Sequence, residues 1–208
     1  MGHGRWGRRA VRLVAAVLGA VVLVACGRGG DPGPVGPTVP VEETTTTVAP
    51  IDITHKPEVV TVDYAQAVMV ELDRVLGEAV RAMVADGGPN KEFLDKLNAV
   101  YDEPSLEDKQ SVYGEIAADG MEAFRNPPGD PVTKLEGVLR SDPHCVVLAV
   151  DRTFAALLAS PNPREDPISY IALAPKAGDS DPAGFNRTPW SIVFDGGTLD
   201  GREPLNAC

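Results

Sequence analysis

Histidine, cysteine and aromatic residues are scarce in this chain. Its 208 residues include three histidines, three cysteines and only 5% aromatic residues. Basic residues are also few, since 19 lysines and arginines stand against 30 acidic residues and leave a net charge of −11. Affinity for nucleic acid begins with lysines and arginines that neutralise phosphates, so this balance argues against a nucleic-acid partner. A content of 43% hydrophobic residues is nevertheless enough for one folded domain.

The first 25 residues have the composition of an export signal. Four arginines and no acidic residue precede an apolar run from Leu13 to Ala25 that only Gly19 interrupts. A spanning helix needs about 20 apolar residues, so this run is too short to cross a membrane, but it suits the apolar region of a signal peptide. We predict that residues 1–25 are a signal peptide.

The end of this run, Leu23-Val24-Ala25-Cys26-Gly27, resembles the lipobox of bacterial lipoproteins. In that family a diacylglycerol is attached to the cysteine and the leader is cut off before it. The resemblance implies that Cys26 is the lipidated first residue of a protein held at the outer face of the cytoplasmic membrane. An uncleaved anchor or an ordinary secretory signal is the alternative.

Removal of the leader changes the charge of the chain. The mature protein keeps 15 basic and 30 acidic residues, a net charge of −15. Anionic headgroups repel such a chain, so attachment depends on the acyl chains, two or more of which give stable anchoring.

Residues 26–57 have the composition of a linker. Between Gly27 and Pro57 there are six prolines, five glycines and six threonines. Such a segment cannot bury enough apolar surface to offset the entropy lost on ordering. We therefore predict a disordered spacer between the lipid and a domain at residues 58–208. The threonine run at residues 44–47 is either O-glycosylated or unmodified.

The first part of the domain has helical periodicity. Apolar residues recur at steps of three and four from Tyr64 to Ala85, and Gly87-Gly88 would end this helix after a start capped by Asp63. A second helix is expected from about Asn90 to Tyr101. It would bury Phe93, Leu94, Leu97 and Val100. A third would open at Ser105 with a capping box and place Val112, Ile116, Gly120 and Phe124 on one face.

The second part has the pattern of β-strands. Segments 132–140 and 144–151 flank a turn and predict a hairpin, and its unbroken apolar run from Cys145 to Val150 suits a central strand buried on both faces. Further strands are expected at 168–173 and 190–194. Phe154, Leu157 and Leu158 either continue the second strand or begin a short helix. Three helices followed by four strands predict an α+β domain with helices on one face of an antiparallel sheet.

This order of elements resembles the layout of the nuclear transport factor 2-like fold. The resemblance covers residues 63–195 and includes a tryptophan-bearing late strand at Trp190. It implies a strongly curved four-stranded sheet that the helices close into a cone with a pocket. It carries no catalytic residue over to this chain.

Motifs for catalysis and for metal binding are missing from the domain. His144 is its only histidine, which excludes a zinc site built on two or three histidines, and no G-x-S-x-G motif occurs. The stretch Asp179-Ser180-Asp181 with Gly184 begins like a calcium loop but has Trp190 where an acidic ligand is needed. We expect no catalytic residue, no metal and no cofactor. Paired carboxylates are left open, because spacing alone does not select a pair.

The two remaining cysteines have one pairing available. If Cys26 carries lipid, only Cys145 and Cys208 can form an intramolecular disulfide in an oxidising compartment. Such a bond would tie the last residue to the central strand, and two separate thiols are the alternative.

We expect the protein to be a non-catalytic binding or accessory lipoprotein, with a cell-envelope protein as a candidate partner. A small-ligand pocket protein of the nuclear transport factor 2-like kind is the second hypothesis, and a structural spacer the third.

Overall fold

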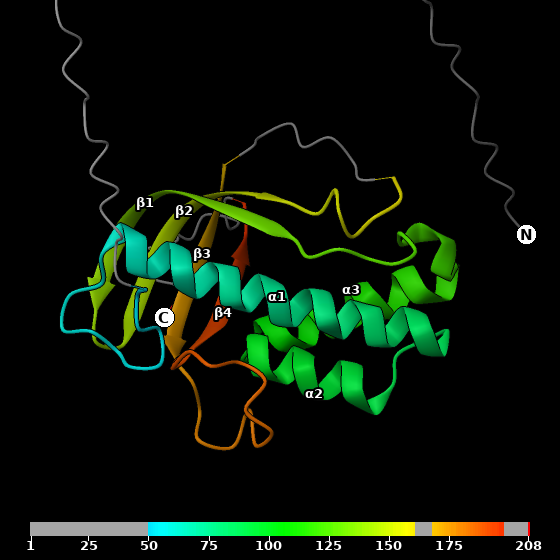
Figure 1. Ribbon diagram of the computed structural model, residues 1–208, viewed down its shortest axis with the longest axis horizontal. Coiled ribbons are helices and arrows are strands. Elements are labelled where there is room, and N and C mark those ends of the chain that lie inside the picture. Colours follow the sequence, from blue (N-terminus) through cyan, green and yellow to red (C-terminus); the bar gives the residue numbers. More distant parts are fainter. Residues whose placement is uncertain (1–49, 161–167, 198–207) are drawn as a thin grey trace, which may run out of the picture. The chain divides into compact units, whose positions relative to one another are not determined.

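The computed structural model describes residues 50–160, 168–197 and 208, so Cys26 and the predicted leader lie outside the described residues. Within the described ranges, three α-helices precede a four-stranded antiparallel sheet, which confirms the predicted α+β fold (Figure 1). The elements are α1 (Val62–Asp86), α2 (Lys91–Val100), α3 (Ser105–Asp119), the 3₁₀ turn η1 (Met121–Ala123), β1 (Val132–Asp142), β2 (Cys145–Thr153), β3 (Ile168–Pro175) and β4 (Trp190–Gly196).

The first helix follows the predicted apolar stripe, but a different residue caps it. The Thr61 side chain accepts the hydrogen bond from the Tyr64 amide, so the expected cap at Asp63 is wrong. Asp63 lies in the first turn, where a carboxylate still favours the positive end of the helix dipole. The helix ends as predicted at Gly87, whose φ of 72° is left-handed and suits glycine.

The second and third helices depart from the prediction in detail. Asn90 caps α2 through its side chain, whereas Pro104 occupies the cap position of α3 and no side-chain hydrogen bond caps that helix. The predicted capping box at Ser105 is therefore wrong. Leu94, which the sequence predicts to be buried, is 39% exposed, and Val112, from the predicted face of the third helix, is 41% exposed. The third helix ends at Asp119, so the predicted shared face does not extend to residue 124.

The sheet is a meander in the order β1-β2-β3-β4, joined by antiparallel pairs. The hairpin between β1 and β2 and the burial of β2 on both faces confirm the prediction. Register shifts in β1 and between β3 and β4 mark bulges, which increase twist and give the sheet its curvature. Residues 154–158 form neither a continuation of the second strand nor a helix. They form a turn, and the last of them, Leu158, makes an isolated bridge to Phe124.

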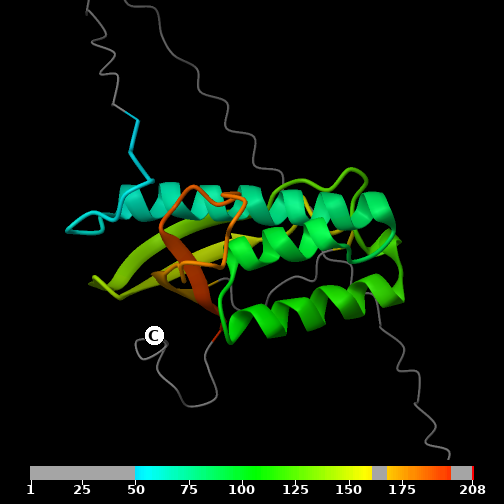
Figure 2. The same ribbon diagram turned by 90° about the horizontal axis from the view of Figure 1, so that it is seen from below.

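Helices cover one face of the sheet, and Figure 2 shows α1, α2 and α3 one beside the next. The main core lies between them and the inward residues of the strands, with Leu72 and Leu76 from α1, Phe93 from α2 and Leu148 from β2 fully enclosed. The connection from α2 to α3 covers the outer edge of β4, because the Asp102 amide donates to the carbonyl of Ile192. This contact brings the end of α2 to the sheet.

The chain before α1 contacts the domain. Ile53 and Val60 pack against the core, and the Lys56 ammonium donates to the carbonyl of Pro143 over 2.6 Å. The Tyr64 hydroxyl donates to the carbonyl of His55. Among the described residues no helix combines the length and the apolar character that crossing a membrane requires.

The connection between β3 and β4 is held by buried polar groups. The carboxylate of Asp181 is almost fully buried and accepts hydrogen bonds from the amides of Phe185 and Asn186. It also forms an ion pair with Lys176. Arg187 then contacts Glu71 of α1 with an N–O distance of 2.6 Å. These contacts fix residues 176–189 against the first helix.

Candidate functional site

A buried group of charges lies between the helices and the sheet. Arg152 of β2 is 1% exposed and donates hydrogen bonds of 2.7 Å to Asp73 of α1 and to Asp195 of β4. The hydroxyl of Tyr101, which follows α2, lies 3.3 Å from Asp195 and 3.4 Å from Arg152. We call Arg152, Asp73, Asp195 and Tyr101 the Arg152 cluster; it joins three elements that are distant in the sequence.

Arg152 and Asp73 reach this place through the period of their own elements. Arg152 follows Leu148 and Val150 on the inward face of β2, because alternate residues of a strand share a face. Asp73 lies within the buried stripe of α1, four residues after Met69 and three before Leu76. The cluster is thus a charged insertion into two otherwise apolar core faces.

The charges of the cluster largely neutralise one another. A guanidinium stays protonated in proteins, and its fork donates to two carboxylates at once. Removing charges from water is costly, and only close partners offset that cost. Asp73 and Asp195 both accept from Arg152, so the two carboxylates share one cation. Burial raises the pKa of Tyr101 well above its ordinary value, so its hydroxyl stays protonated.

A small apolar pocket lies next to the cluster, between α3 and the turn that follows β2. Its volume is about 170 Å³. Its wall is almost entirely apolar, and the residues around it are Tyr101, Lys109, Val112, Tyr113, Ile116, Phe154, Leu157 and Leu158. We call this cavity the α3 pocket. Phe154 also stacks on Arg152, with the guanidinium 5.2 Å from the ring centre, so the pocket wall and the cluster share a contact.

The tyrosines of the α3 pocket are hydrogen-bond donors. Burial raises the pKa of Tyr113, which keeps this phenol neutral at physiological pH. Its ring packs edge-to-face on Phe93 of α2 at 5.8 Å between centres, which fixes its orientation. An apolar cavity with a few convergent polar groups is the usual form of a small-molecule site. Two wider hollows of about 400 Å³ each are lined mainly by residues of the connection between β3 and β4.

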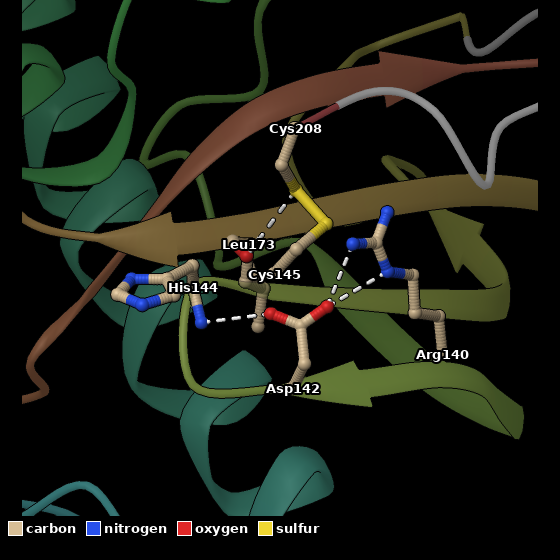
Figure 3. Close-up of a disulfide and its surroundings, with 6 residues drawn as sticks. All are labelled: Arg140, Asp142, His144, Cys145, Leu173 and Cys208. Atoms are coloured by element: carbon tan, nitrogen blue, oxygen red, sulfur yellow. Dashed lines mark hydrogen bonds and ion pairs between the residues drawn. A yellow bond between two sulfur atoms is a disulfide. The ribbon is translucent and has the colours of Figure 1, made fainter.

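The structure joins the predicted cysteine pair. Cys145 and Cys208 form a disulfide with 5.7 Å between their Cα atoms (Figure 3). Cys145 lies on the sheet face opposite the helices, where Val147 and Ala172 are also buried. The bond therefore ties the end of the chain to the second face of β2, away from the α3 pocket.

The other candidates from the sequence have structural positions. His144 is exposed in the hairpin turn, where its amide donates to Asp142 (Figure 3). In the calcium-like stretch, the carboxylate of Asp181 is already occupied by two amides and Lys176. No group of three or more metal-ligand side chains occurs within residues 50–160, 168–197 and 208.

The sequence alone did not reveal the Arg152 cluster or the α3 pocket. The signal for the cluster was present, because Asp73 interrupts an apolar helical stripe and Arg152 continues the inward face of a buried strand. Charged residues at core positions are rare unless they are paired. The pocket has no comparable signal, since its lining comes from α3, from the end of α2 and from a turn whose path the sequence left open.

Comparisons with known proteins find no matching family model, no matching curated protein and no matching solved structure. The lipobox and the likeness to the nuclear transport factor 2-like layout therefore stay predictions from the sequence.

Proposed function

We propose that this protein is a non-catalytic binding module, anchored outside the cytoplasmic membrane by a lipid on Cys26, that holds a small apolar group in the α3 pocket. The observation that carries the binding role is the pocket itself, an almost entirely apolar cavity of about 170 Å³ that is lined in part by Tyr101, Tyr113 and Lys109. The observation that supports the anchor is the leader ending in Leu23-Val24-Ala25-Cys26.

The size of the pocket supports a small ligand. Typical sites for drug-sized molecules measure roughly 300–1,000 Å³, well above the volume of the α3 pocket. A dry cavity of about 150 Å³ lined by Leu, Ile and Phe accommodates benzene. The pocket therefore suits one six-membered ring or a short branched chain, with a single polar substituent directed at Tyr101, Tyr113 or Lys109.

The charge arrangement supports binding without catalysis. General-base chemistry needs a carboxylate or imidazole with a free lone pair within hydrogen-bond reach of the substrate. The two carboxylates behind the pocket wall both accept from Arg152, and His144, the histidine of the predicted domain, is exposed in the hairpin turn. The cluster's role in this proposal is to hold α1, β2 and β4 together behind the pocket.

Two related hypotheses accompany this proposal. A relationship to nuclear transport factor 2-like proteins is supported by the order of helices and strands and by the curved sheet, and it would place the chain among pocket proteins. The second hypothesis is that a cell-envelope protein binds this domain, either with or without the small ligand. Both are compatible with a domain carried on a lipid and a spacer.

The test uses the mature lipidated protein in lipid nanodiscs and a neutral aromatic probe, 4-fluorobenzyl alcohol. Fluorine NMR should detect saturable binding that empty nanodiscs lack, and the alcohol should be recovered unchanged. Val112→Phe, from a position at the pocket that is 41% exposed, should fill the cavity and weaken binding at least tenfold. Binding that is unchanged in this variant would show that the alcohol occupies another place and would overturn the proposal.

A further inference from the structure

The ammonium of Lys109, at the α3 pocket, has only distant hydrogen-bond and ion-pair partners in the described part of the chain. Its side chain, on α3, is only 19% exposed. Its ammonium lies 3.5 Å from the Asp195 carboxylate, 3.5 Å from the Asp195 carbonyl and 3.8 Å from Asp108. Ionised hydrogen bonds from nitrogen to oxygen are normally about 2.7–2.9 Å long. Among the described residues, this mostly buried cation has no oxygen partner closer than 3.5 Å.

The nearest carboxylate, Asp195, already pairs with Arg152. It cannot move closer to Lys109 without weakening that pair. Asp195 accepts from Arg152 over 2.7 Å, and the Tyr101 hydroxyl lies 3.3 Å from the same oxygen atom. The ammonium of Lys109 lies 5.9 Å from the centre of the Tyr101 ring, a position that gives only a weak cation–π attraction. Two positive and three negative side chains meet here, with Asp108 among the latter. Within the described ranges, the partners of Lys109 all lie 3.5 Å or more from its ammonium, so an anion there would find a donor without a partner at normal hydrogen-bond distance.

We infer that the ligand of the α3 pocket is a small monocarboxylate, whose apolar body fills the cavity and whose carboxylate accepts hydrogen bonds from Lys109. This inference rests on the proposed binding function and names the substrate class of the same site. The volume of about 170 Å³ limits the body to about one aromatic ring or a short branched chain. A carboxylate at hydrogen-bond distance from Lys109 would replace contacts of 3.5 Å or longer with one of normal length.

The charge at the pocket selects against the other ligand classes. A cationic ligand would meet Lys109 in a partly buried place, where like charges repel more strongly than in water. A neutral ligand would gain the apolar contacts and a weaker hydrogen bond from Lys109 than an anion accepts.

The experiment compares two probes that differ in charge but share one ring. 4-Fluorobenzoate and 4-fluorobenzyl alcohol are titrated into the mature lipidated protein in nanodiscs and followed by fluorine NMR. The acid should bind at least tenfold more tightly than the alcohol. In Lys109→Met, which keeps most of the length of the side chain and removes its charge, the acid should lose at least tenfold in affinity and the alcohol much less, so the ratio should fall towards one.

Matched variants separate the two proposals. Lys91→Met removes a lysine charge at an exposed position of α2 and should change neither affinity. Val112→Phe should weaken both probes. If the acid and the alcohol bind equally to the unaltered protein, the carboxylate inference is wrong and the binding pocket stands. If neither probe binds, the proposed function fails, and the inference fails with it.

Discussion

Arg152 and Asp73 are 79 positions apart in the sequence, yet their side chains form an ion pair of 2.7 Å with almost no exposure to solvent. The pair joins the central strand to the longest described helix, α1. Asp195 completes it from β4 at the same distance. One guanidinium thus holds two carboxylates from two elements, and the consequences for stability can be measured.

Arg152→Met should destabilise the domain severely. It leaves two buried carboxylates without their main partner, and breaking a buried pair in this way costs about 3–5 kcal/mol. At roughly 2–4 °C per kcal/mol for a domain of this size, Tm should fall by at least about 6 °C. Arg152→Lys should recover only part of the loss, because an ammonium cannot bridge both carboxylates as the planar fork does.

The control for Arg152 is Lys91→Met, which breaks a surface pair with Asp95 that is open to water. Exposed pairs contribute about 0.2–1 kcal/mol at most, so the Tm of this variant should stay close to that of the unaltered protein. Equal losses in the two variants, measured by calorimetry, would mean that the Arg152 cluster does not hold the elements together.

Glu71→Gln should change the dependence of stability on pH. Burial by itself would raise the pKa of Glu71, but hydrogen bonds from Arg187 and Arg74 outweigh it and hold the pKa well below the ordinary value of 4.5. A lowered pKa in the folded state stabilises the fold above the pKa of the unfolded chain. That contribution is lost progressively as the pH falls below about 4.5.

Urea midpoints measured between pH 3 and pH 7 test this prediction. The unaltered protein should be more stable than Glu71→Gln at pH 7, and the difference should shrink as the pH falls below about 4.5. Glu58→Gln removes the same charge at an exposed position and controls for net charge. Parallel curves for the unaltered protein and Glu71→Gln would contradict the assignment.

Cys208→Ser should lower stability through the unfolded state. The bond to Cys145 closes a loop with a sequence separation of 63, for which the chain-entropy model gives roughly 4 kcal/mol. Tm should fall by several degrees, and a reductant should lower the Tm of the unaltered protein but not that of the variant. Mass spectrometry without reduction should find the two cysteine peptides linked. Two freely alkylated thiols in the native protein would refute the bond.

Cys26→Ala should abolish attachment of lipid. The resemblance to the lipobox predicts that the variant keeps its leader and takes up no radiolabelled fatty acid, whereas Cys208→Ala takes up label like the unaltered protein. The labelled band and its size on a gel give both readouts. Labelling that persists in the Cys26 variant would exclude this cysteine as the lipid site.

Local patterns in the sequence determined the order of helices and strands. The steps of three and four in residues 64–85 and the unbroken apolar run from Cys145 to Val150 depend only on the period of each element, and the structure confirms both. The pairing of Cys145 with Cys208 followed from the number of cysteines and from the predicted lipid on Cys26. Cap residues were less reliable, because Thr61 and Asp63 both have suitable side chains and neighbouring geometry decides between them.

The Arg152 cluster and the α3 pocket were decided by tertiary structure alone. Asp73, Arg152 and Asp195 meet only when α1, β2 and β4 pack together, and a charged residue at a core position does not indicate which partner will neutralise it. The pocket depends on the turn at residues 154–158, whose apolar side chains fit a strand, a helix or a wall equally well. Periodicity reports which face of an element is buried, whereas a site depends on what the fold places opposite that face.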